Sequence, residues 1–247
     1  MFSLRYLVMA LPLCFAQAAS PETLNIAVAS NFKVTLEKLI AAEPNRLNHK
    51  LKIISGATGS LYTQIVNGAP FDIFLAADMH RPQLLDQERQ LPAGSRKAYA
   101  IGQLVLWIPG ASSQVDEENL SLFTGNLAIA NPRTAPYGLA ALSLLEKLNT
   151  KKPRLIMGEN VAQAYQFVHT GNAQAGLVAL SQVIDQAIDP QSYWHVPQQY
   201  HEPIEQQLVV LNSSPASTEF VNYLLSDPAR NIISSSGYQV PGNTNRD

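Results

Sequence analysis

Segments typical of buried strands alternate with segments of helical periodicity along most of this chain. Residues 24–28 and 51–54 are rich in β-branched and aliphatic side chains, as expected for strands. The first is followed by Phe32, Leu36 and Leu39, which recur at helical spacing. This alternation indicates a largely parallel sheet covered by helices, so the predicted fold class is α/β.

The same strand–turn–helix unit recurs in both halves of the chain. Residues 103–108 form a predicted strand that ends at Pro109-Gly110 and crosses into a second lobe, and the strand near residues 206–211 returns the chain to the first lobe. We therefore expect one lobe from residues 19–103 with 207–247 and another from 104–206. Pro215 and Pro228 mark two closing helices, with Ser214 and Asp227 as their predicted capping residues.

The first 18 residues have the pattern of a secretory signal peptide. Arg5 precedes an apolar run at residues 6–15, and Ala16-Gln17-Ala18 is a small-x-small cleavage pattern. The run is far short of the roughly 20 residues of a membrane span, and a bulky Leu13 argues against lipid attachment at Cys14. Because Cys14 is the only cysteine, the mature chain has no disulfide or thiol chemistry. The predicted location is the periplasm.

The charge balance argues against a nucleic-acid partner. The chain has 17 Lys and Arg against 19 Asp and Glu, and removal of Arg5 with the leader brings the formal charge to −3. The one basic cluster, at residues 151–154, fits a solvated turn between a helix and a strand. Without a basic stripe, binding to a polyanion is not expected.

Four junctions between a predicted strand and the next helix place small, hydroxyl-bearing or turn-forming residues at a helix start. They are Ala29-Ser30-Asn31-Phe32, Gly56-Ala57-Thr58-Gly59-Ser60, Thr134-Ala135-Pro136-Tyr137-Gly138 and Gly158-Glu159-Asn160-Val161. A helix start presents unpaired backbone N–H groups, and such groups bind anions without a formal positive charge. The alternative is that Ser30, Thr58 and Asn160 only cap their own helices.

Motifs in order along nearly the whole chain after the leader resemble the periplasmic molybdate-binding proteins, which are solute-binding proteins of ABC transporters. They are the Ala-Ser-Asn-Phe end of residues 24–32, Ser-Gly-Ala-Thr-Gly-Ser-Leu at 55–61, Asn-Gly-Ala-Pro-Phe-Asp-Ile-Phe-Leu-Ala-Ala-Asp at 67–78, Asn-Pro-Arg-Thr-Ala-Pro-Tyr-Gly at 131–138, Gly-Glu-Asn-Val at 158–161, Ala-Gly-Leu-Val-Ala-Leu-Ser at 175–181 and Ser-Gly-Tyr at 236–238. The resemblance implies a two-lobed type II periplasmic-binding-protein fold with a ligand cleft between the lobes.

The resemblance also implies a site made only of neutral donors. These are the hydroxyl and amide of Ser30, Asn31, the hydroxyl and amide of Thr58, and the backbone amides of Tyr137 and Val161. A branch of the family places a ligand-binding tyrosine where this chain has residues 179–181, Ala-Leu-Ser, so Asn31 is expected to take part instead. The implied partners are molybdate or tungstate and the membrane permease of an ABC transporter, with the protein a monomer that needs no cofactor.

A ring of neutral donors favours fully deprotonated dianions. Molybdate and tungstate meet that condition, whereas partly protonated phosphate must leave an O–H without an acceptor. Sulfate is also a tetrahedral dianion, so only the size of the cavity can exclude it. A binding protein for sulfate, thiosulfate or another tetrahedral oxyanion therefore remains the alternative.

Residues that could suggest an enzyme or a metal site do not form a recognisable pattern. The chain lacks the nucleophile elbow, the phosphate-binding loop, the dinucleotide fingerprint and the zinc-protease motif. His195 with His201, and Asp72 and Asp78 with His80, are too few or wrongly spaced for a metal site. Near the predicted anion site, we expect the Glu159 side chain to point away, and Arg133 to lie on the surface or at a lobe contact rather than to clamp the anion.

Overall fold

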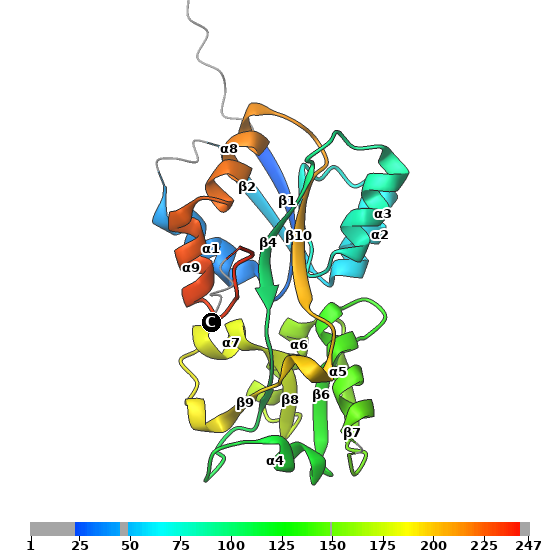
Figure 1. The fold of residues 1–247 in the computed structure, drawn as a ribbon, viewed down its shortest axis with the longest axis vertical. Helices are drawn as coiled ribbons and strands as arrows, with labels where there is room; N and C mark the ends of the chain where they lie inside the picture. Colours follow the sequence, from blue (N-terminus) through cyan, green and yellow to red (C-terminus); the bar gives the residue numbers. More distant parts are fainter. Residues whose placement is uncertain (1–22, 45–48, 149, 243–247) are drawn as a thin grey trace, which may run out of the picture.

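The computed structural model describes residues 23–44, 49–148 and 150–242. The predicted leader at residues 1–18 and Cys14 lie outside them. Two five-stranded sheets form two lobes that are stacked along the long axis of the molecule (Figure 1). Each sheet has helices packed beside it, which confirms the predicted α/β class.

The first lobe is built on a sheet with the strand order β2-β1-β3-β10-β4. Its strands are β1 (Thr23–Ala29), β2 (Lys50–Gly56), β3 (Ile73–Leu75), β4 (Arg96–Gly102) and β10 (Ile204–Val210), and its helices are α1 (Lys33–Ala42), α2 (Thr58–Val66), α3 (His80–Arg89), α8 (Pro215–Leu224) and α9 (Asp227–Ser235). Strands β1, β2 and β3 are parallel, whereas β10 runs antiparallel to β3 and β4. Helices α2 and α3 lie on one side of the sheet and α1, α8 and α9 on the other (Figure 1).

The second lobe repeats this plan with the strand order β7-β6-β8-β5-β9. Its strands are β5 (Leu104–Trp107), β6 (Asn126–Ala130), β7 (Arg154–Gly158), β8 (Ala175–Ala179) and β9 (Tyr193–His195), its helices are α4 (Glu117–Ser121), α5 (Pro136–Lys147), α6 (Val161–His169) and α7 (Leu180–Asp185), and its 3-10 turns are η1 (Pro190–Ser192) and η2 (Gln198–Tyr200). Strands β6, β7 and β8 are parallel, and β5 is antiparallel to β8 and β9. The antiparallel β10 and β5 carry the chain between the lobes.

The chain crosses between the lobes twice, once at Gly102–Leu104 and once between β9 and β10. A Cβ atom at Gly102 would lie 2.2 Å from the hydroxyl oxygen of Tyr137 and 2.8 Å from Nε2 of Gln206. Only glycine therefore lets Tyr137 of the second lobe pack this closely against the crossing strand. The lobe boundaries expected from the sequence stay a prediction, and β10 begins its pairing in the first sheet already at Ile204.

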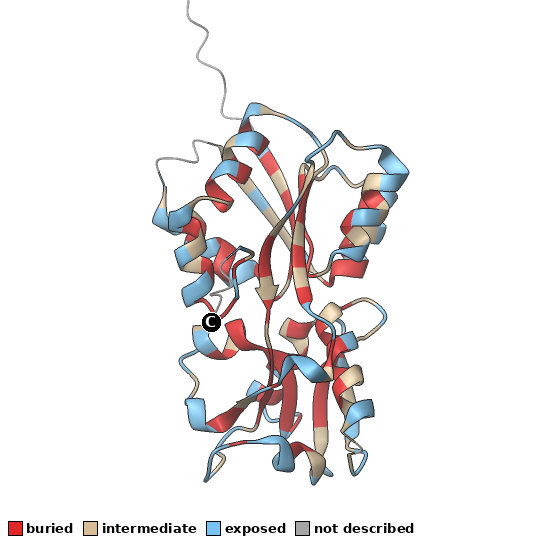
Figure 2. Ribbon diagram, viewed as in Figure 1, coloured by how far each residue is buried: buried red, intermediate tan, exposed pale blue. Residues whose placement is uncertain are grey.

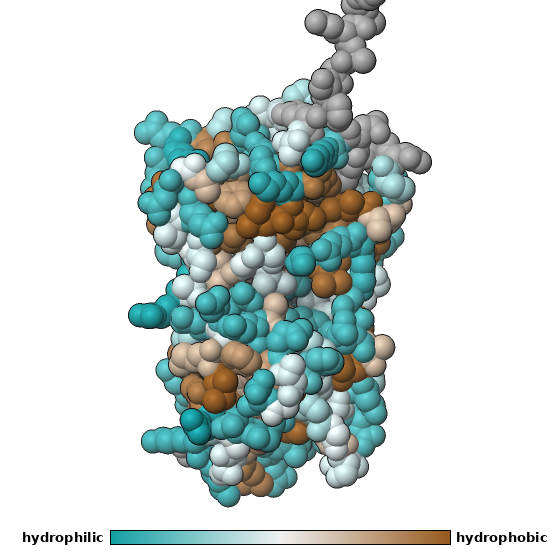
Figure 3. Space-filling model, turned by 180° about the vertical axis from the view of Figure 1, so that it is seen from behind, coloured by the Kyte–Doolittle hydropathy of each residue, from teal (hydrophilic) through white to brown (hydrophobic). Residues whose placement is uncertain are grey.

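Each lobe encloses its own hydrophobic core, and buried residues follow the strands and the inner faces of the helices (Figure 2). In α6, Val161, Ala164, Tyr165 and Val168 recur at helical spacing and are buried. Seen from behind, a hydrophobic band crosses the first lobe, while much of the remaining surface on that side is hydrophilic (Figure 3).

The two closing helices begin with different caps. At α8 the prediction is confirmed, because the Ser214 side chain accepts a hydrogen bond from the backbone N–H of Ser217. At α9 it is wrong by one residue. Ser226 is the N-cap, whereas Asp227 is the first helical residue. Its negative charge there interacts favourably with the positive end of the helix dipole.

Candidate functional site

One small cavity between the lobes brings together all of the predicted site residues. The lining consists of Ala29, Ser30, Asn31, Gly56, Ala57, Thr58, Ala77, Ala135, Pro136, Tyr137, Asn160 and Val161. Four strands of the two sheets, β1, β2, β6 and β7, end next to it, so two strand-to-helix junctions from each lobe face one another. The carboxyl ends of strands are where ligands bind in open α/β sheets.

The lobes are closed tightly around this cavity. The cavity is small, with a volume of about 10 Å³. On one side of it, the backbone N–H of Gly59 in the first lobe donates to the carbonyl of Thr134 in the second lobe at 2.8 Å. At the start of α2, the Gly59 N–H is therefore used by the opposite lobe, whereas Thr58 lines the cavity.

Every predicted site residue except Ser30 has a backbone N–H group without a hydrogen-bond acceptor among the described residues. These residues are Asn31, Thr58, Tyr137 and Val161. Thr58 and Val161 are the first residues of α2 and α6, and Tyr137 is the second residue of α5. The first N–H groups of a helix have no intrahelical acceptor, so these groups are available to an anion.

Ser30 differs from its prediction in one respect. Its backbone N–H donates to the carbonyl of Gly56 at 3.0 Å, so the expected amide contact with a ligand is not available. No described residue bonds to its hydroxyl, which is therefore free to donate. Ser30 is not a helix cap either, because α1 begins after an N-cap at Phe32.

The Thr58 hydroxyl is oriented by a backbone group. The N–H of Ala77 donates to Thr58 Oγ1 at 3.1 Å, and Thr58 is 1% exposed. Because a hydroxyl can accept through its lone pairs and still donate its hydrogen, this contact leaves the hydrogen free. The capping alternative is wrong for Thr58, since the N-cap of α2 is Ala57. It is correct for Asn160, whose Oδ1 accepts from the N–H of Gln163 at 3.1 Å.

The Asn31 side chain is held by the protein itself. Its Nδ2 atom donates to Oε1 of Gln206 at 3.0 Å and to the hydroxyl oxygen of Tyr238 at 3.2 Å. Both amide hydrogens are thereby used, and only the backbone N–H of Asn31 is left for a ligand. Sequence reasoning missed Gln206 and Tyr238, because they lie 175 and 207 residues away along the chain.

The cavity is electrically neutral. Among the described residues, Tyr137 is the only titratable one in the lining, and burial, with a further contribution from Tyr238, raises the pKa of that phenol well above its ordinary value. Glu159 is exposed and does not line the cavity, as expected, and the exposed Arg133 does not line it either. The arrangement offers hydrogen-bond donors from both lobes and no ionised acceptor, which suits an anion without protons.

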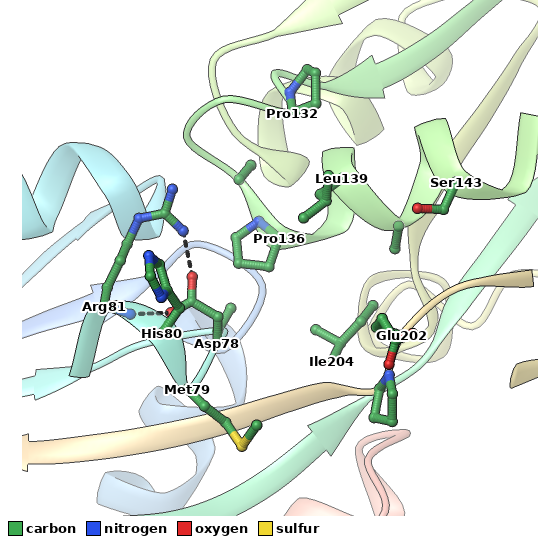
Figure 4. Close-up of a pocket in the computed structure, with 14 residues that line it drawn as sticks. Asp78, Met79, His80, Arg81, Pro132, Pro136, Leu139, Ser143, Glu202 and Ile204 are labelled. Atoms are coloured by element: carbon green, nitrogen blue, oxygen red, sulfur yellow. Dashed lines mark hydrogen bonds and ion pairs between the residues drawn. The ribbon is translucent and has the colours of Figure 1, made fainter. Parts of the chain in front are cut away.

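A larger pocket of about 420 Å³ lies next to this cavity and shares Ala77, Ala135 and Pro136 with it. Figure 4 shows Asp78 and Arg81 of the first lobe on one side, facing Pro136 and Leu139 of α5 across the pocket. Arg81 donates to the Asp78 carboxylate and, at 3.1 Å, to the Arg133 carbonyl of the second lobe. Because the acidic side chains of Asp78 and Glu202 line this pocket and would repel an anion, it is not the better candidate.

Of the acidic and histidine residues considered above, Asp72, Asp78 and His201 bond to other groups of the protein. Asp72 accepts hydrogen bonds from the backbone and side chain of Asn25 and from Asn212 at the end of the strand. Within the described ranges, no group of three or more His, Cys, Asp or Glu residues is placed to hold a metal ion. In the part of the chain that the structure describes, no helix is both long enough and apolar enough to span a membrane.

Comparisons with known proteins agree over nearly the whole chain. The profile of the family described as bacterial extracellular solute-binding protein matches residues 24–239. The chain is 43% identical to the molybdate-binding protein ModA of Azotobacter vinelandii, with 96% of this chain and 98% of that protein covered. It is 39% identical to ModA of Rhodobacter capsulatus, with 93% of each covered.

A solved structure leads to the same group. The periplasmic molybdate-binding protein of Azotobacter vinelandii matches with a TM-score of 0.81 and 37% identity, covering 88% of this chain and 99% of that one. The fold is thus shared with a protein of that kind. The chain belongs to the bacterial extracellular solute-binding protein family.

Proposed function

We propose that this protein binds molybdate or tungstate outside the cytoplasm and delivers it to the membrane permease of an ABC transporter. The observation that carries the proposal is the neutral cavity, where free donors from both lobes face one another without an ionised acceptor. Support also comes from the two relatives named for molybdate binding at 43% and 39% identity. The proposed role is binding rather than catalysis. The leader peptide would place the mature protein in the periplasm. We propose that it acts there as a monomer.

The donors divide between the two lobes. From the first lobe come the hydroxyls of Ser30 and Thr58 and the backbone N–H groups of Asn31 and Thr58. From the second lobe come the backbone N–H groups of Tyr137 and Val161. Six donors supply the four oxygens of a tetrahedral dianion with at least one hydrogen bond each. A donor set shared by two lobes is complete only when the lobes are closed, so ligand binding favours closure.

Selectivity follows from the absence of acceptors and from size. A ligand that keeps an O–H at neutral pH, such as phosphate, would bury that group without an acceptor, at a cost of about 1–3 kcal/mol. Sulfate has no such hydrogen, but its shorter bonds would leave some donors beyond good hydrogen-bond distance. The alternative, a sulfate or thiosulfate carrier, therefore differs in affinity rather than in the kind of site.

A competition titration tests the proposal. The mature protein is titrated by calorimetry with molybdate, tungstate, sulfate, thiosulfate and phosphate in the same buffer and at the same ionic strength. We expect tight binding of molybdate and tungstate, and sulfate at least ~100-fold weaker, a difference of about 2.7 kcal/mol. Equal affinity for sulfate would favour the alternative, and no heat with any oxyanion would refute the proposed function.

A further inference from the structure

A buried polar cluster lies behind the anion cavity and joins the two lobes. Asn31, Tyr99, Gln206 and Tyr238 belong to the first lobe, and Ser181 at the start of α7 belongs to the second. All of these residues are at most 6% exposed. The cluster therefore has little access to water while the lobes are closed.

The atoms at its centre connect Ser181 to Asn31 through Tyr238. The Tyr238 hydroxyl oxygen lies 2.7 Å from the Asn31 carbonyl oxygen and 3.0 Å from Ser181 Oγ. Ser181 Oγ is 3.3 Å from the same carbonyl. Tyr238 donates to the Asn31 carbonyl or to Ser181 Oγ, and in both cases the Ser181 hydroxyl is bonded to the first lobe, through the tyrosine oxygen or through the same carbonyl. Asn31 is thus held through both its carbonyl and its side chain.

The chain is shaped to bring Tyr238 to this place. Gly237 has a φ of +89°, and a Cβ atom there would lie 2.8 Å from Ile184 Cδ1 and 3.3 Å from the backbone nitrogen of Ser181. Gly237 therefore allows a turn in direct contact with α7. On the other side, the backbone of Gln239 exchanges two hydrogen bonds with Ile101 of β4, at 2.7 and 3.0 Å. Tyr238 is in this way anchored in the first lobe and contacts α7 of the second lobe.

We infer that Ser181 is a positioning residue that stabilises the closed lobes around Asn31 and so sets the affinity for the anion without touching it. This inference rests on the proposed function. In an open form, α7 moves away with its lobe, and Ser181 and Tyr238 exchange their mutual hydrogen bond for water. Apparent affinity is the intrinsic affinity multiplied by the fraction of competent protein. A contact that favours closure therefore strengthens binding of every ligand by the same factor.

An equal change in the affinities for different anions distinguishes a contact that favours closure from a contact with the ligand. Loss of a donor to the anion changes the ratio of affinities whenever two anions differ in oxygen position or charge density. Loss of a closure contact leaves that ratio unchanged. Ser181 occupies the region where a branch of the family places its ligand-binding tyrosine, yet it does not line the anion cavity here. Its geometry consequently favours the second effect.

The test compares Ser181→Ala with Ser192→Ala in the mature protein. Ser192 is a matched control, because it is 7% exposed in the same lobe and its hydroxyl bonds to the Asp189 carbonyl within that lobe. Calorimetry gives the Kd values for molybdate and tungstate, and small-angle scattering gives the radius of gyration with and without molybdate. We expect Ser181→Ala to raise both Kd values by the same factor, about five- to tenfold for one neutral hydrogen bond, and Ser192→Ala to change them less than twofold.

A second variant keeps the experiment decisive if Ser181→Ala folds poorly. Tyr238→Phe keeps the ring and removes the hydroxyl, and it should weaken binding at least as much. Adding Ser181→Ala to it should raise Kd by a smaller factor than Ser181→Ala does in the wild-type protein, since the two hydroxyls share one contact. A wild-type Kd in Ser181→Ala, or unequal factors for molybdate and tungstate, would overturn the inference. If the wild-type protein binds no oxyanion, the proposed function fails first and the inference falls with it.

Discussion

Thr58→Val removes one hydroxyl from the centre of the site and leaves the shape of the side chain nearly unchanged. That hydroxyl accepts from the Ala77 N–H at 3.1 Å and has its hydrogen free toward the cavity. A hydrogen bond to a charged group contributes about 1.5–3 kcal/mol. At 1.4 kcal/mol per factor of ten, molybdate affinity should therefore fall roughly 10- to 100-fold.

The same substitution affects stability by a separate route. Valine leaves the Ala77 N–H without its acceptor, and Thr58 and Ala77 are each 1% exposed. Leaving a buried donor unpaired costs about 1–3 kcal/mol. The free energy of unfolding of the ligand-free protein should decrease by this amount. The two effects can be measured independently, because affinity is determined on protein that is folded.

Calorimetric titration with molybdate measures the first effect and urea denaturation without ligand measures the second. Thr58→Ser is the control, since it keeps the hydroxyl. Its molybdate affinity and its contact with Ala77 should be closer to those of the wild-type protein than in Thr58→Val. A Thr58→Val protein that is less stable but binds molybdate with the wild-type Kd would refute the reasoning. The hydroxyl would then serve only to hold Ala77.

Three further predictions concern the crossing between the lobes at Gly102 and the titration of buried groups. Gly102→Ala places a Cβ atom 2.2 Å from the Tyr137 hydroxyl, so closure should cost about 1–3 kcal/mol more; calorimetry should show weaker molybdate binding, and an unchanged Kd would contradict the role given to Gly102. Because no group lining the cavity titrates near neutrality, the Kd for molybdate should stay constant between about pH 6 and pH 9, and a tenfold change across this range would indicate an ionisable ligand contact. Burial raises the pKa of Tyr238 to about 12, with hydrogen bonds from Ser181 and Asn31 opposing it. The unfolded chain then loses this proton first, so the free energy of unfolding should be unaffected by Tyr238 below about pH 10 and fall between about pH 10 and 12, by up to ~1.4 kcal/mol per pH unit. Urea denaturation of Tyr238→Phe should show a correspondingly smaller slope, and an identical slope would exclude Tyr238 as its source.

The helix starts around the cavity could be predicted because their signals are local. A strand of β-branched residues followed by a turn and an apolar helical face is contained within about 15 residues, as in residues 24–39. Pro136 at the first position of α5 is such a signal, and it places the Tyr137 N–H where no intrahelical acceptor exists. The α/β class and the neutral character of the site follow from these features.

The missed elements depend on neighbours that are distant in the chain. Strand β4 pairs with β10, which begins more than 100 residues later, and its Arg-Lys-Ala-Tyr-Ala-Ile-Gly sequence does not have the apolar run that marked the other strands. Whether a polar group caps its own helix is also decided at a distance. Thr58 is used by Ala77 rather than by α2, whereas Asn160 caps its own helix as the local pattern suggests.

The sequence by itself determined which residues stand at the helix starts, because helix capping and hydrophobic periodicity act over a few neighbouring residues. Only the tertiary structure decided which of their donors remain free. The Ser30 N–H is taken by Gly56 of the adjacent strand, and the Asn31 side chain is taken by Gln206 and Tyr238. A buried donor bonds to whichever acceptor the packed lobes bring within reach, and that acceptor is set by the fold rather than by the neighbouring sequence.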